Sequence, residues 1–507
     1  MRVLVLGWDF SPRLSGGVGS ACRGLSEALA RAGTEVLFVL PRLRGDEEPA
    51  RVRLVSSEEA ARNAPVPDLL AAPLDPAPIT HAPRALVPED ELRFTHTALP
   101  PSAETRAVAG DGEPAPSLPA PSESLRLLAL DSPLRPYLGE AEYAGLVRGL
   151  LARIRRAPGA PRESAVGARG GRGQRLVAAP HAPALERETT TGTRAKRASA
   201  RQLLYGETRG AEVERYARTV LAAVAHERFD VVHAHDWMTF PAGLLVKEQH
   251  GRPLLVHFHS NESERSGERA APDVTAIEQA ALDGADRVLC VSHASARELR
   301  ERYTVETAKV RVLHNAFSPP EGGVPERGPD RAPVVLYLGR LAQQKGPDVF
   351  LDAAARVHAR DPRCRFVLAG DGELYPELVA RARELDLADA VRFTGFLAGE
   401  ALAQAYRGAD VYVMPSAAEP FGISALEALS MGVPTIVSRG AGVTEVVRSV
   451  LRFEPGDAAD LAEKMVALLE RPALRRALVA SGLREVKDLR WERPARALRA
   501  FYDEVVA

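Results

Sequence analysis

The sequence is poor in cysteine: the 507 residues include only Cys22, Cys290 and Cys364, which lie far apart. An odd number at such spacing excludes a disulfide framework and gives no pattern of zinc ligands. The sequence also has no run of about 18 apolar residues, which disfavours a membrane-spanning helix. Its first apolar segment, Met1–Leu6, is too short for a signal peptide. We therefore expect a cytoplasmic protein.

An excess of charge of either sign is missing as well. The chain has 66 Lys and Arg residues against 67 Asp and Glu residues, a formal net charge of −1. This balance disfavours a dedicated binder of nucleic acid or of an anionic membrane, and we expect neither nucleic acid nor stable membrane insertion. What the sequence does have is an ordinary globular composition over a length that predicts about two or three domains.

The N-terminal segment has the pattern of a βαβ unit. A continuous apolar strand, Arg2–Gly7, precedes a loop with the sequence Gly16-Gly17-Val18-Gly19. A segment with helical period follows at Ala21–Ala32, stops at Gly33 and leads to a second apolar strand, Val36–Leu40. This order predicts two parallel strands joined by a helix.

A long segment, about residues 44–200, interrupts this clear pattern. Residues 99–121 are dense in Pro and Ala, and residues 157–200 are rich in Gly, Arg, Ser and Thr. Such low-complexity segments bury too little apolar surface to offset the entropy of ordering, so we expect a partly disordered insertion. Within it, Leu125–Leu130 and Glu140–Ile154 are apolar enough to dock on the domain.

Strands and helices alternate again after the insertion. The predicted elements are the helix Val213–His226, the strands Asp230–His233 and Pro253–His257, the helix Ala276–Ala285, the strand Arg287–Val291, a helix capped by Ser292, and the strand Val310–Leu313. Residues 321–332 are rich in Gly, Pro and charge and predict an interdomain linker. We therefore expect an N-terminal domain over residues 1–320.

A second alternating unit follows the linker. Its predicted strands are Val334–Leu338, Phe366–Ala369, Val391–Thr394, Val411–Met414 and Thr435–Val437, and its predicted helices are Asp348–Ala359, Glu373–Leu385, Glu400–Gly408 and Gly422–Ser430. This rhythm predicts a doubly wound parallel sheet with helices on both faces, over residues 333–485. Residues 486–507 predict a C-terminal helix that packs back on the N-terminal domain. Ligands of such folds bind at the C-terminal ends of the strands.

The glycine loop before the first helix suits an anion. Glycine lets the backbone approach a phosphate, and a helix N-terminus adds N–H groups and partial positive charge. A dinucleotide-binding loop requires a third glycine, where this sequence has Cys22, and an acidic residue after the second strand, where it has Pro41-Arg42. NAD is therefore disfavoured, and a simple turn without a ligand remains the alternative.

Two cations follow the first strand of the second domain. Gly339-Arg340 and then Lys345-Gly346 come directly after Val334–Leu338. The planar fork of Arg and the compact charge of Lys together suit a diphosphate. The alternative is a pair of solvated surface cations. The place of both residues at the end of a strand disfavours this alternative.

Two glutamates follow the strand Val411–Met414. Glu419 lies in the loop Glu419-Pro420-Phe421-Gly422-Ile423, and Glu427 lies on the helix after it. Gly422 would open this helix with exposed N–H groups, ready for an anion. A carboxylate on such a helix can accept hydrogen bonds from two vicinal hydroxyls, as a ribose presents them. The alternative of a surface acid fits Glu419 better than Glu427, which has apolar neighbours and requires a partner.

Together these motifs resemble the donor site of retaining nucleotide-sugar glycosyltransferases, glycosyltransferase family 4 and the related glycogen and starch synthases. The resemblance covers residues 1–40 and nearly everything from Tyr205 onward. It implies an α/β protein of the GT-B fold, with two Rossmann-like doubly wound domains that face each other across a cleft. It also implies a nucleoside diphosphate sugar as donor, a glucan or other saccharide as acceptor, and neither a metal nor another cofactor.

The resemblance implies a role for each donor-site residue. Arg340 and Lys345 would neutralise the diphosphate and stabilise it as a leaving group. Glu419 would contact the donor sugar, and Glu427 would hold the ribose hydroxyls. The backbone groups implied at the donor are those of Phe421, Gly422 and Ile423, with Gly16 and Gly17 closing over the diphosphate from the opposite domain.

A histidine motif in the first domain also resembles the family. The segment Val256-His257-Phe258-His259-Ser260 ends a predicted strand, and the resemblance implies that His259 lies beside the donor sugar. Alternation along an extended strand places His257 on the same face as His259. Glu262 and Arg265, which follow, are candidates for the acceptor side.

The segment His233-Ala234-His235-Asp236-Trp237 resembles a histidine-aspartate-tryptophan segment of the glycogen synthases. The resemblance implies that Asp236 binds acceptor hydroxyls and that Trp237 lines a sugar subsite. An exposed loop acid and a core-packing Trp are the alternative. A metal at the paired histidines is disfavoured because no acidic or cysteine ligand set stands out nearby in the sequence.

The resemblance thus predicts a retaining hexosyltransferase that moves a hexose, with glucose preferred, to a glucan or other saccharide. Leu14 stands where ADP-glucose glycogen synthases carry a lysine, which disfavours ADP-glucose and ordinary glycogen elongation. The rival interpretations are a lipid- or cell-surface-polysaccharide glycosyltransferase, a non-catalytic sugar-binding relative, and a nucleotide-sugar epimerase.

Overall fold

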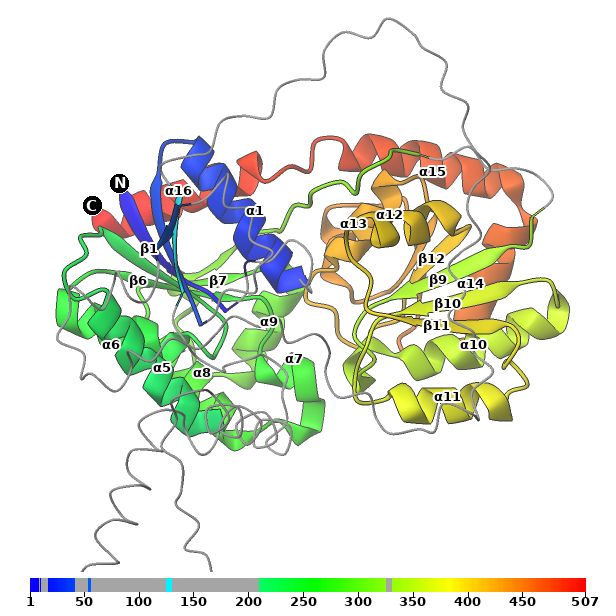
Figure 1. Ribbon diagram of the computed structural model, residues 1–507, viewed down its shortest axis with the longest axis horizontal. Coiled ribbons are helices and arrows are strands. Elements are labelled where there is room, and N and C mark those ends of the chain that lie inside the picture. Colours follow the sequence, from blue (N-terminus) through cyan, green and yellow to red (C-terminus); the bar gives the residue numbers. More distant parts are fainter. Residues whose placement is uncertain (9, 11–16, 42–52, 56–124, 130–208, 325–330) are drawn as a thin grey trace, which may run out of the picture.

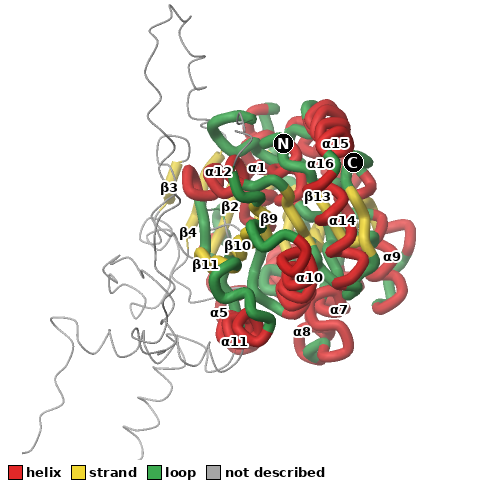
Figure 2. The backbone as a smooth tube through the Cα atoms, turned by 90° about the vertical axis from the view of Figure 1, so that its right-hand side faces the viewer, coloured by secondary structure: helices red, strands yellow, loops and turns green. Residues whose placement is uncertain are grey.

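The computed structural model describes residues 1–8, 10, 17–41, 53–55, 125–129, 209–324 and 331–507. They form two lobes, each built round one parallel sheet with helices on its faces (Figure 1). Figure 2, in which the two lobes overlap, shows strands with helices above and below them. Most of the predicted insertion, including residues 99–121, 157–200 and Glu140–Ile154, lies outside the described residues.

The described residues of the first lobe form an eight-stranded sheet in the order β3-β4-β2-β1-β5-β6-β7-β8. Its strands are β1 (Arg2–Leu6), β2 (Glu35–Leu40), β3 (Arg53–Val55), β4 (Leu125–Ala129), β5 (Val231–His235), β6 (Leu254–Phe258), β7 (Arg287–Cys290) and β8 (Val310–Val312), all parallel to their neighbours. The central strands are buried on both faces, which is why they appear in the sequence as continuous apolar runs. The predicted parallel pairing of the first two strands is confirmed.

Helices on both sides of this sheet complete the first lobe. They are α1 (Gly17–Arg31), α5 (Arg209–Ala223), α6 (Phe240–His250), α7 (Glu262–Ser266), α8 (Pro272–Gly284) and α9 (His293–Arg302), with the 3-10 turns η3 (Gly267–Arg269) and η4 (Thr307–Lys309). The Ser292 side chain caps α9, as predicted. Helix α6 is absent from the prediction because Pro241 and Gly243 suggest a loop. The proline occupies the first turn, where it costs no hydrogen bond, and the glycine lets the helix approach Leu254 on β6.

The second lobe is a six-stranded parallel sheet in the order β11-β10-β9-β12-β13-β14, which is the classical doubly wound order 3-2-1-4-5-6. Its strands are β9 (Val334–Leu338), β10 (Arg365–Ala369), β11 (Val391–Gly395), β12 (Val411–Met414), β13 (Thr435–Ser438) and β14 (Leu451–Phe453). The prediction places the first five within one residue and misses β14. Three residues are too few to show a periodic pattern.

The helices of the second lobe cover both faces of its sheet. They are α10 (Pro347–Arg360), α11 (Tyr375–Glu384), α12 (Gly399–Gly408), α13 (Ile423–Ser430), α14 (Ala458–Glu470) and α15 (Pro472–Val486), with the 3-10 turns η5 (Gln343–Lys345) and η6 (Gly442–Glu445). Among the described helices of both lobes, none combines the length and the apolar character that crossing a bilayer requires.

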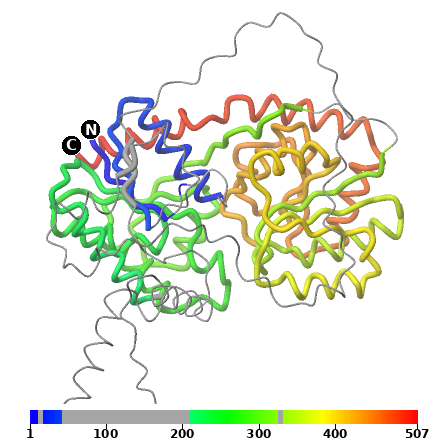
Figure 3. The backbone as a smooth tube through the Cα atoms, viewed as in Figure 1, coloured from blue at the N-terminus to red at the C-terminus, as the bar shows by residue number. Residues whose placement is uncertain are grey.

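The last helix, α16 (Glu492–Val506), returns to the first lobe and packs on α1. The chain ends beside its own N-terminus, as Figure 3 shows. Trp491 lies directly against Gly24, where a Cβ would lie 2.2 Å from the indole nitrogen. Where the chain crosses between the lobes, the Arg490 guanidinium lies 5.1 Å from the centre of the Phe317 ring. One apolar cluster runs through this crossing from the first lobe into the second.

A carboxylate adds a polar contact between the lobes. Glu445 in η6 of the second lobe accepts hydrogen bonds from the backbone N–H groups of His293 and Ala294, at 2.8 and 2.9 Å, at the start of α9. Its Oε2 also lies 2.8 Å from Nε2 of His314. These hydrogen bonds hold the pKa of Glu445 below its usual value despite partial burial. The carboxylate therefore sets the N-terminus of a first-lobe helix against the second lobe.

A tight contact fixes the loop after β9 on the loop after β12. Gly346 has φ 62°, and a Cβ there would lie 2.3 Å from the carbonyl oxygen of Pro415. The left-handed conformation and the close approach both require glycine. The two loops therefore keep one relative position, which matters for the side chains that they carry.

We predict that Gly346→Ala lowers the free energy of unfolding by about 3 kcal/mol, since the added Cβ displaces backbone as well as straining φ. Gly456 is the matched control: its φ is 82°, but nothing lies within 4 Å of an added Cβ. Gly456→Ala should cost about 1 kcal/mol, the strain of the left-handed conformation alone. Denaturant unfolding of both variants measures the difference, and equal losses would contradict the tight contact.

Candidate active site

The second sheet reverses its strand order between β9 and β12, which are neighbours in the sheet. In doubly wound sheets, ligands bind at the C-terminal ends of the strands beside such a switch point. The loops that begin here, after β9 and after β12, carry the sequence-predicted Arg340, Lys345 and Glu419. The fold thus collects the predicted donor residues at one edge of the second sheet.

Lys345 and Glu419 form an ion pair between these two loops, with 2.7 Å between Nζ and Oε2. The hydroxyl of Ser416, a residue that the prediction missed, donates to the same oxygen at 2.8 Å. The backbone joins the loops as well, because the N–H of Ala417 donates to the carbonyl of Gln344 at 2.8 Å. Since 26% of the Lys345 side chain stays exposed, the cation is held in position and can still meet a ligand.

Arg340 is half-buried at the C-terminal end of β9, and its carbonyl accepts a hydrogen bond from the Tyr337 hydroxyl at 2.7 Å. The loop that carries it packs on the end of β10, where a Cβ at Gly370 would lie 1.8 Å from the carbonyl oxygen of Gly339. The prediction missed Gly370 and Gly372, although two glycines directly after a strand indicate such a close approach. The backbone around Arg340 is therefore fixed by contacts with β9, which leads to it, and with the end of β10.

Helix α13 begins at this edge without a side-chain cap. Gly422 before it has φ 105°, and a Cβ there would lie 2.6 Å from Cε of Met414, so glycine is required. The N–H groups in the first turn of a helix have no partner within the helix and carry partial positive charge. Phe421 and Ile423 turn their side chains inward and are buried. Segment 421–423 therefore has buried side chains at an uncapped helix start, and its contact with a donor stays a prediction.

Glu427 lies one turn after Ile423 on α13, and residues four apart share one face of a helix. The hydroxyl of Tyr406 on α12 donates to its Oε2 at 2.9 Å. Burial raises the pKa of Glu427 to about 7. The prediction missed Tyr406 because nothing in the sequence distinguishes it from any other residue of an amphipathic helix. An ionised carboxylate that accepts a hydrogen bond from one hydroxyl can accept further hydrogen bonds from others.

The first lobe reaches this edge at two places. At the start of α1, an added Cβ on Gly17 would lie 3.9 Å from Cδ1 of Ile423 at the start of α13. Helix α7, which follows His259 closely, contacts η5 and hence the segment that ends at Lys345. Gly16 lies outside the described residues. Gly17 of the first lobe and Ile423 of the second, both predicted for the donor site, therefore lie close to each other.

Four histidines form a buried row at the C-terminal ends of β5 and β6. The ring centres of His233 and His235 lie 4.2 Å apart, and those of His257 and His259 lie 4.4 Å apart. The rings of His257 and His259 stack, so the predicted placement on one face is confirmed. Nδ1 of His235 lies 2.9 Å from Nε2 of His259, which links the two strands.

Burial keeps these imidazoles uncharged. It lowers the pKa of His259 to about 3 and holds the pKa values of His233, His235 and His257 well below the usual value. On α16, the hydroxyl of Tyr502 lies 2.7 Å from Nδ1 of His233, a contact that the prediction missed. The first lobe therefore holds a buried row of neutral rings, in contrast to the charged groups that the second lobe carries at its loops.

Asp236 holds the backbone beside this row. Its Oδ1 accepts a hydrogen bond from the N–H of His259 at 2.8 Å, and burial raises its pKa to about 6. The residue has φ 59°, a strained conformation for a side chain other than glycine. Trp237 shows 7% of its surface and packs in the apolar core of the first lobe. Acceptor binding by Asp236 and Trp237 stays a prediction, since both are buried here.

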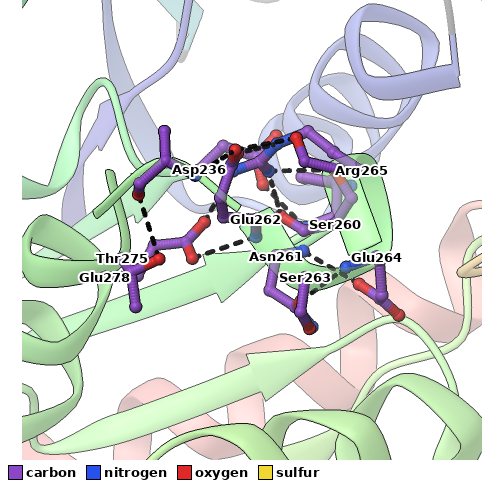
Figure 4. Close-up of polar contacts among 12 residues, drawn as sticks. Asp236, Ser260, Asn261, Glu262, Ser263, Glu264, Arg265, Thr275 and Glu278 are labelled. Carbon is purple, nitrogen blue, oxygen red and sulfur yellow. Dashed lines mark hydrogen bonds and ion pairs between the residues drawn. The ribbon is translucent and has the colours of Figure 1, made fainter. Parts of the chain in front are cut away.

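A buried ion-pair network holds the loop after His259 (Figure 4). The Arg265 guanidinium donates to Glu278 Oε1 at 2.7 Å and to the Ser260 carbonyl at 2.6 Å, and it lies 3.0 Å from Glu262. Burial raises the pKa of Glu278, which also accepts a hydrogen bond from Tyr303. Glu262 and Arg265 bind each other, and these contacts fix the loop in place. The sequence gives no sign of Glu278, which is on α8.

Three groups of side chains in the described part of the chain place three potential metal-ligating atoms within 4.8 Å of one another. The groups are Cys22 with His235 and His259, His233 with His235 and His257, and His293 with His314 and Glu445. The first contains a cysteine from α1 that the sequence did not associate with the histidines. The expectation that no metal is bound stays a prediction.

Comparison with known proteins gives two matching families and several relatives. Residues 168–321 match Glycosyltransferase Family 4, and residues 325–484 match Glycosyl transferases group 1. The chain is 32% identical over 316 residues to the D-inositol 3-phosphate glycosyltransferase of Actinosynnema mirum, which covers 57% of this chain and 76% of that relative. The protein of the same name from Thermobispora bispora is 32% identical over 305 residues, or 55% of this chain and 71% of the relative.

A solved structure supports the same assignment at the level of the fold. The sucrose-phosphate synthase of Thermosynechococcus elongatus matches with a TM-score of 0.62 at 19% identity, over 99% of this chain and 98% of that chain. The match extends over both lobes described above. The chain therefore belongs to the group 1 glycosyltransferases of family 4, enzymes of the GT-B fold.

Proposed function

We propose that this glycosyltransferase moves a hexose, glucose in the first instance, from a nucleoside diphosphate sugar to a glucan or other saccharide, with retention at the anomeric carbon. One observation carries the proposal. Lys345, Glu419, the uncapped start of α13 and Glu427 lie together at the switch point of the second sheet, opposite Gly17 of the first lobe. A cation, a helix N-terminus and a carboxylate that can accept hydrogen bonds from ribose hydroxyls suit the parts of such a donor.

In this proposal the second lobe stabilises the diphosphate as it leaves. Arg340 and Lys345 supply fixed charge, and the N–H groups of segment 421–423 supply oriented dipoles. Cleavage of the bond between the anomeric carbon and oxygen develops negative charge on the diphosphate, so groups already in place lower the barrier. With two protein cations and a helix N-terminus in these roles, we propose that the transfer requires no metal ion and no other cofactor.

The sugar itself would lie between Glu419 and His259. Glu419 pairs with Lys345, which makes its carboxylate a poor nucleophile but leaves its second oxygen for a sugar hydroxyl. We therefore propose front-face transfer without a covalent enzyme intermediate. The bond from the anomeric carbon to the phosphate oxygen breaks, a bond to the acceptor oxygen forms on the same face, and the acceptor proton passes to the departing phosphate.

The acceptor has two leading candidates, a glucan and a phosphorylated cyclitol. A glucan acceptor would meet Asp236 and Trp237 only after local movement, because both are buried. The two relatives described above are named for D-inositol 3-phosphate, which makes a phosphorylated cyclitol the second candidate acceptor. A lipid or cell-surface polysaccharide acceptor, a non-catalytic sugar-binding role and an epimerase activity remain rivals that an acceptor screen separates.

A ligand panel followed by an acceptor screen tests the proposal. Thermal unfolding with ADP-, UDP- and GDP-sugars should show a stabilising shift for at least one nucleotide, since a ligand that binds the folded state raises its stability. With that donor, release of the nucleoside diphosphate should depend on an added glucan or D-inositol 3-phosphate. A free or isomerised sugar without an acceptor would indicate an epimerase, and no shift with any donor would refute the donor site.

We predict that Arg340→Ala and Lys345→Ala each lower the turnover number roughly 100-fold or more, because each removes a charge that stabilises the leaving group. Arg363→Ala is the matched control. Arg363 is exposed and pairs with Asp361 at the start of β10, the opposite edge of the sheet, so its loss should leave turnover unchanged. Steady-state kinetics with saturating donor measure the effect. Wild-type rates in both site variants would show that the diphosphate does not bind at this edge.

We predict that donor affinity falls below pH 7 through Glu427. Both ribose hydroxyls donate hydrogen bonds, so they require the ionised carboxylate. Because the pKa of Glu427 is about 7, protonation of this carboxylate competes with donor binding below pH 7. The dissociation constant should rise toward about tenfold per pH unit below 7 and level off above it. Calorimetry with a nucleotide sugar is suitable, since its diphosphate diester does not titrate here.

Glu427→Gln serves as the control for this dependence. The variant should bind the donor roughly tenfold more weakly at pH 8 and should lose the pH dependence. A 2′-deoxyribose analogue of the same donor should lessen the difference between wild type and variant. If the variant keeps the wild-type affinity and pH profile, Glu427 has no ribose role.

A further inference from the structure

The row of buried histidines has more nitrogen atoms than hydrogen-bond partners. Both ring nitrogens of His257, Nε2 of His233 and Nδ1 of His259 are buried and have no hydrogen-bond partner among the described residues. An unsatisfied buried polar atom costs free energy, so each such atom in a native structure requires an explanation. Four such atoms on adjacent side chains leave this row unsatisfied by hydrogen bonds among the described residues, which marks its neighbourhood as a candidate ligand site. The nitrogen atoms that His235 and His259 turn toward each other are not among the four.

The chemistry of the surrounding atoms points to the kind of ligand. Neutral imidazole nitrogen is the commonest protein ligand for a metal ion. Cys22 on α1 brings its sulfur within 4.8 Å of one nitrogen each of His235 and His259. Sulfur with imidazole nitrogen selects zinc and similar transition metals over Mg²⁺ or Ca²⁺, which prefer oxygen.

The distances are close to those of a formed site. Zn²⁺ binds imidazole nitrogen at about 2.0 Å and thiolate sulfur at about 2.3 Å, so the ligand atoms of a tetrahedral site lie about 3.3 to 3.6 Å apart. Nδ1 of His235 and Nε2 of His259 lie 2.9 Å apart, and all three groups fall within 4.8 Å. Side-chain shifts of about 1 Å would bring these three atoms to the spacing of metal ligands.

We infer that Cys22, His235 and His259 form a binding site for a transition-metal ion of the Zn²⁺ class. Binding removes the proton of the Cys22 thiol, which is released to solvent as the sulfur–metal bond forms. The thiolate offsets one of the two positive charges in a buried position. The proton of the hydrogen bond between His235 and His259 moves to the other nitrogen of the ring that carries it, and two nitrogen–metal bonds replace that hydrogen bond. His257 lies beside the three ligands, with a ring centre 5.1 Å from that of His235.

The metal at this place would inhibit the enzyme rather than assist it. This consequence rests on the proposed function, in which His259 contacts the donor sugar. A metal bound through His259 fixes that ring and places positive charge where positive charge develops on the sugar. The site is also distinct from the diphosphate edge, which Arg340 and Lys345 supply with charge from the other lobe. Cys22 itself takes no part in the proposed transfer.

Cobalt is the probe for the site, because a thiolate bound to Co²⁺ gives a charge-transfer absorption band in the near ultraviolet. The metal-stripped full chain should bind one Co²⁺ with this band and with the visible bands of a tetrahedral ion. One equivalent of Zn²⁺ should abolish them. Cys22→Ser should lose the charge-transfer band and bind Co²⁺ roughly 100-fold more weakly, as expected for the loss of a ligand.

Cys364→Ser is the matched control, since Cys364 is equally buried but lies in the second lobe. It should keep the complete spectrum. His235→Gln provides a second test if the Cys22 variant does not fold, and it too should lose the band. Absence of the charge-transfer band in the wild-type chain overturns the inference, as does a band that survives Cys22→Ser.

Inhibition is measured separately, so that the two proposals can fail independently. Zn²⁺ should inhibit transfer by the wild-type chain over the concentration range in which it displaces Co²⁺, whereas Cys22→Ser should have wild-type activity without metal and should resist Zn²⁺. Transfer without any cobalt band refutes the metal site alone. A cobalt band without transfer from any donor refutes the proposed function alone.

Discussion

The ion pair between Lys345 and Glu419 is the contact on which the arrangement of the site depends. It joins the two loops that flank the switch point of the second sheet, and backbone hydrogen bonds and the Gly346–Pro415 contact reinforce it. A partly exposed pair contributes little to stability by itself. Its value is positional, because it holds a cation and a carboxylate at fixed places beside the start of α13.

The two lobes contribute opposite electrostatic characters. The second lobe provides cations and an uncapped helix start, whereas the first lobe provides neutral imidazoles whose charged form burial excludes. A glycosyl transfer separates negative charge on the leaving group from positive charge on the sugar, so this division suits the reaction. Cys22 lies within 4.8 Å of nitrogen atoms of His235 and His259, so the proposed sugar contact and the proposed metal site share His259.

The sequence predicted much of the fold because local patterns specify buried parallel strands. β9 and β12 coincide with their predicted ranges, and most of the other predicted strands agree within one or two residues. Two of the misses have local causes: Pro241 and Gly243 concealed α6, and β14 is too short to show a period. Helices α14 and α15 were not predicted either. Within the site, motifs identified Arg340, Lys345, Glu419 and Glu427, while Tyr406, Ser416 and Glu278 carried no local signal. These three became visible only as partners of charged groups.

The sequence by itself determined the two alternating units, the loops that carry charge and the family resemblance, because each depends on residues close together along the chain. Only the tertiary structure decided which groups meet. It turned Asp236 toward the backbone of His259, paired Glu262 with Arg265, and brought Cys22 of α1 to histidines more than 200 positions away. These outcomes follow from how separate strands and helices pack, and packing between distant segments leaves no periodic trace in a single sequence.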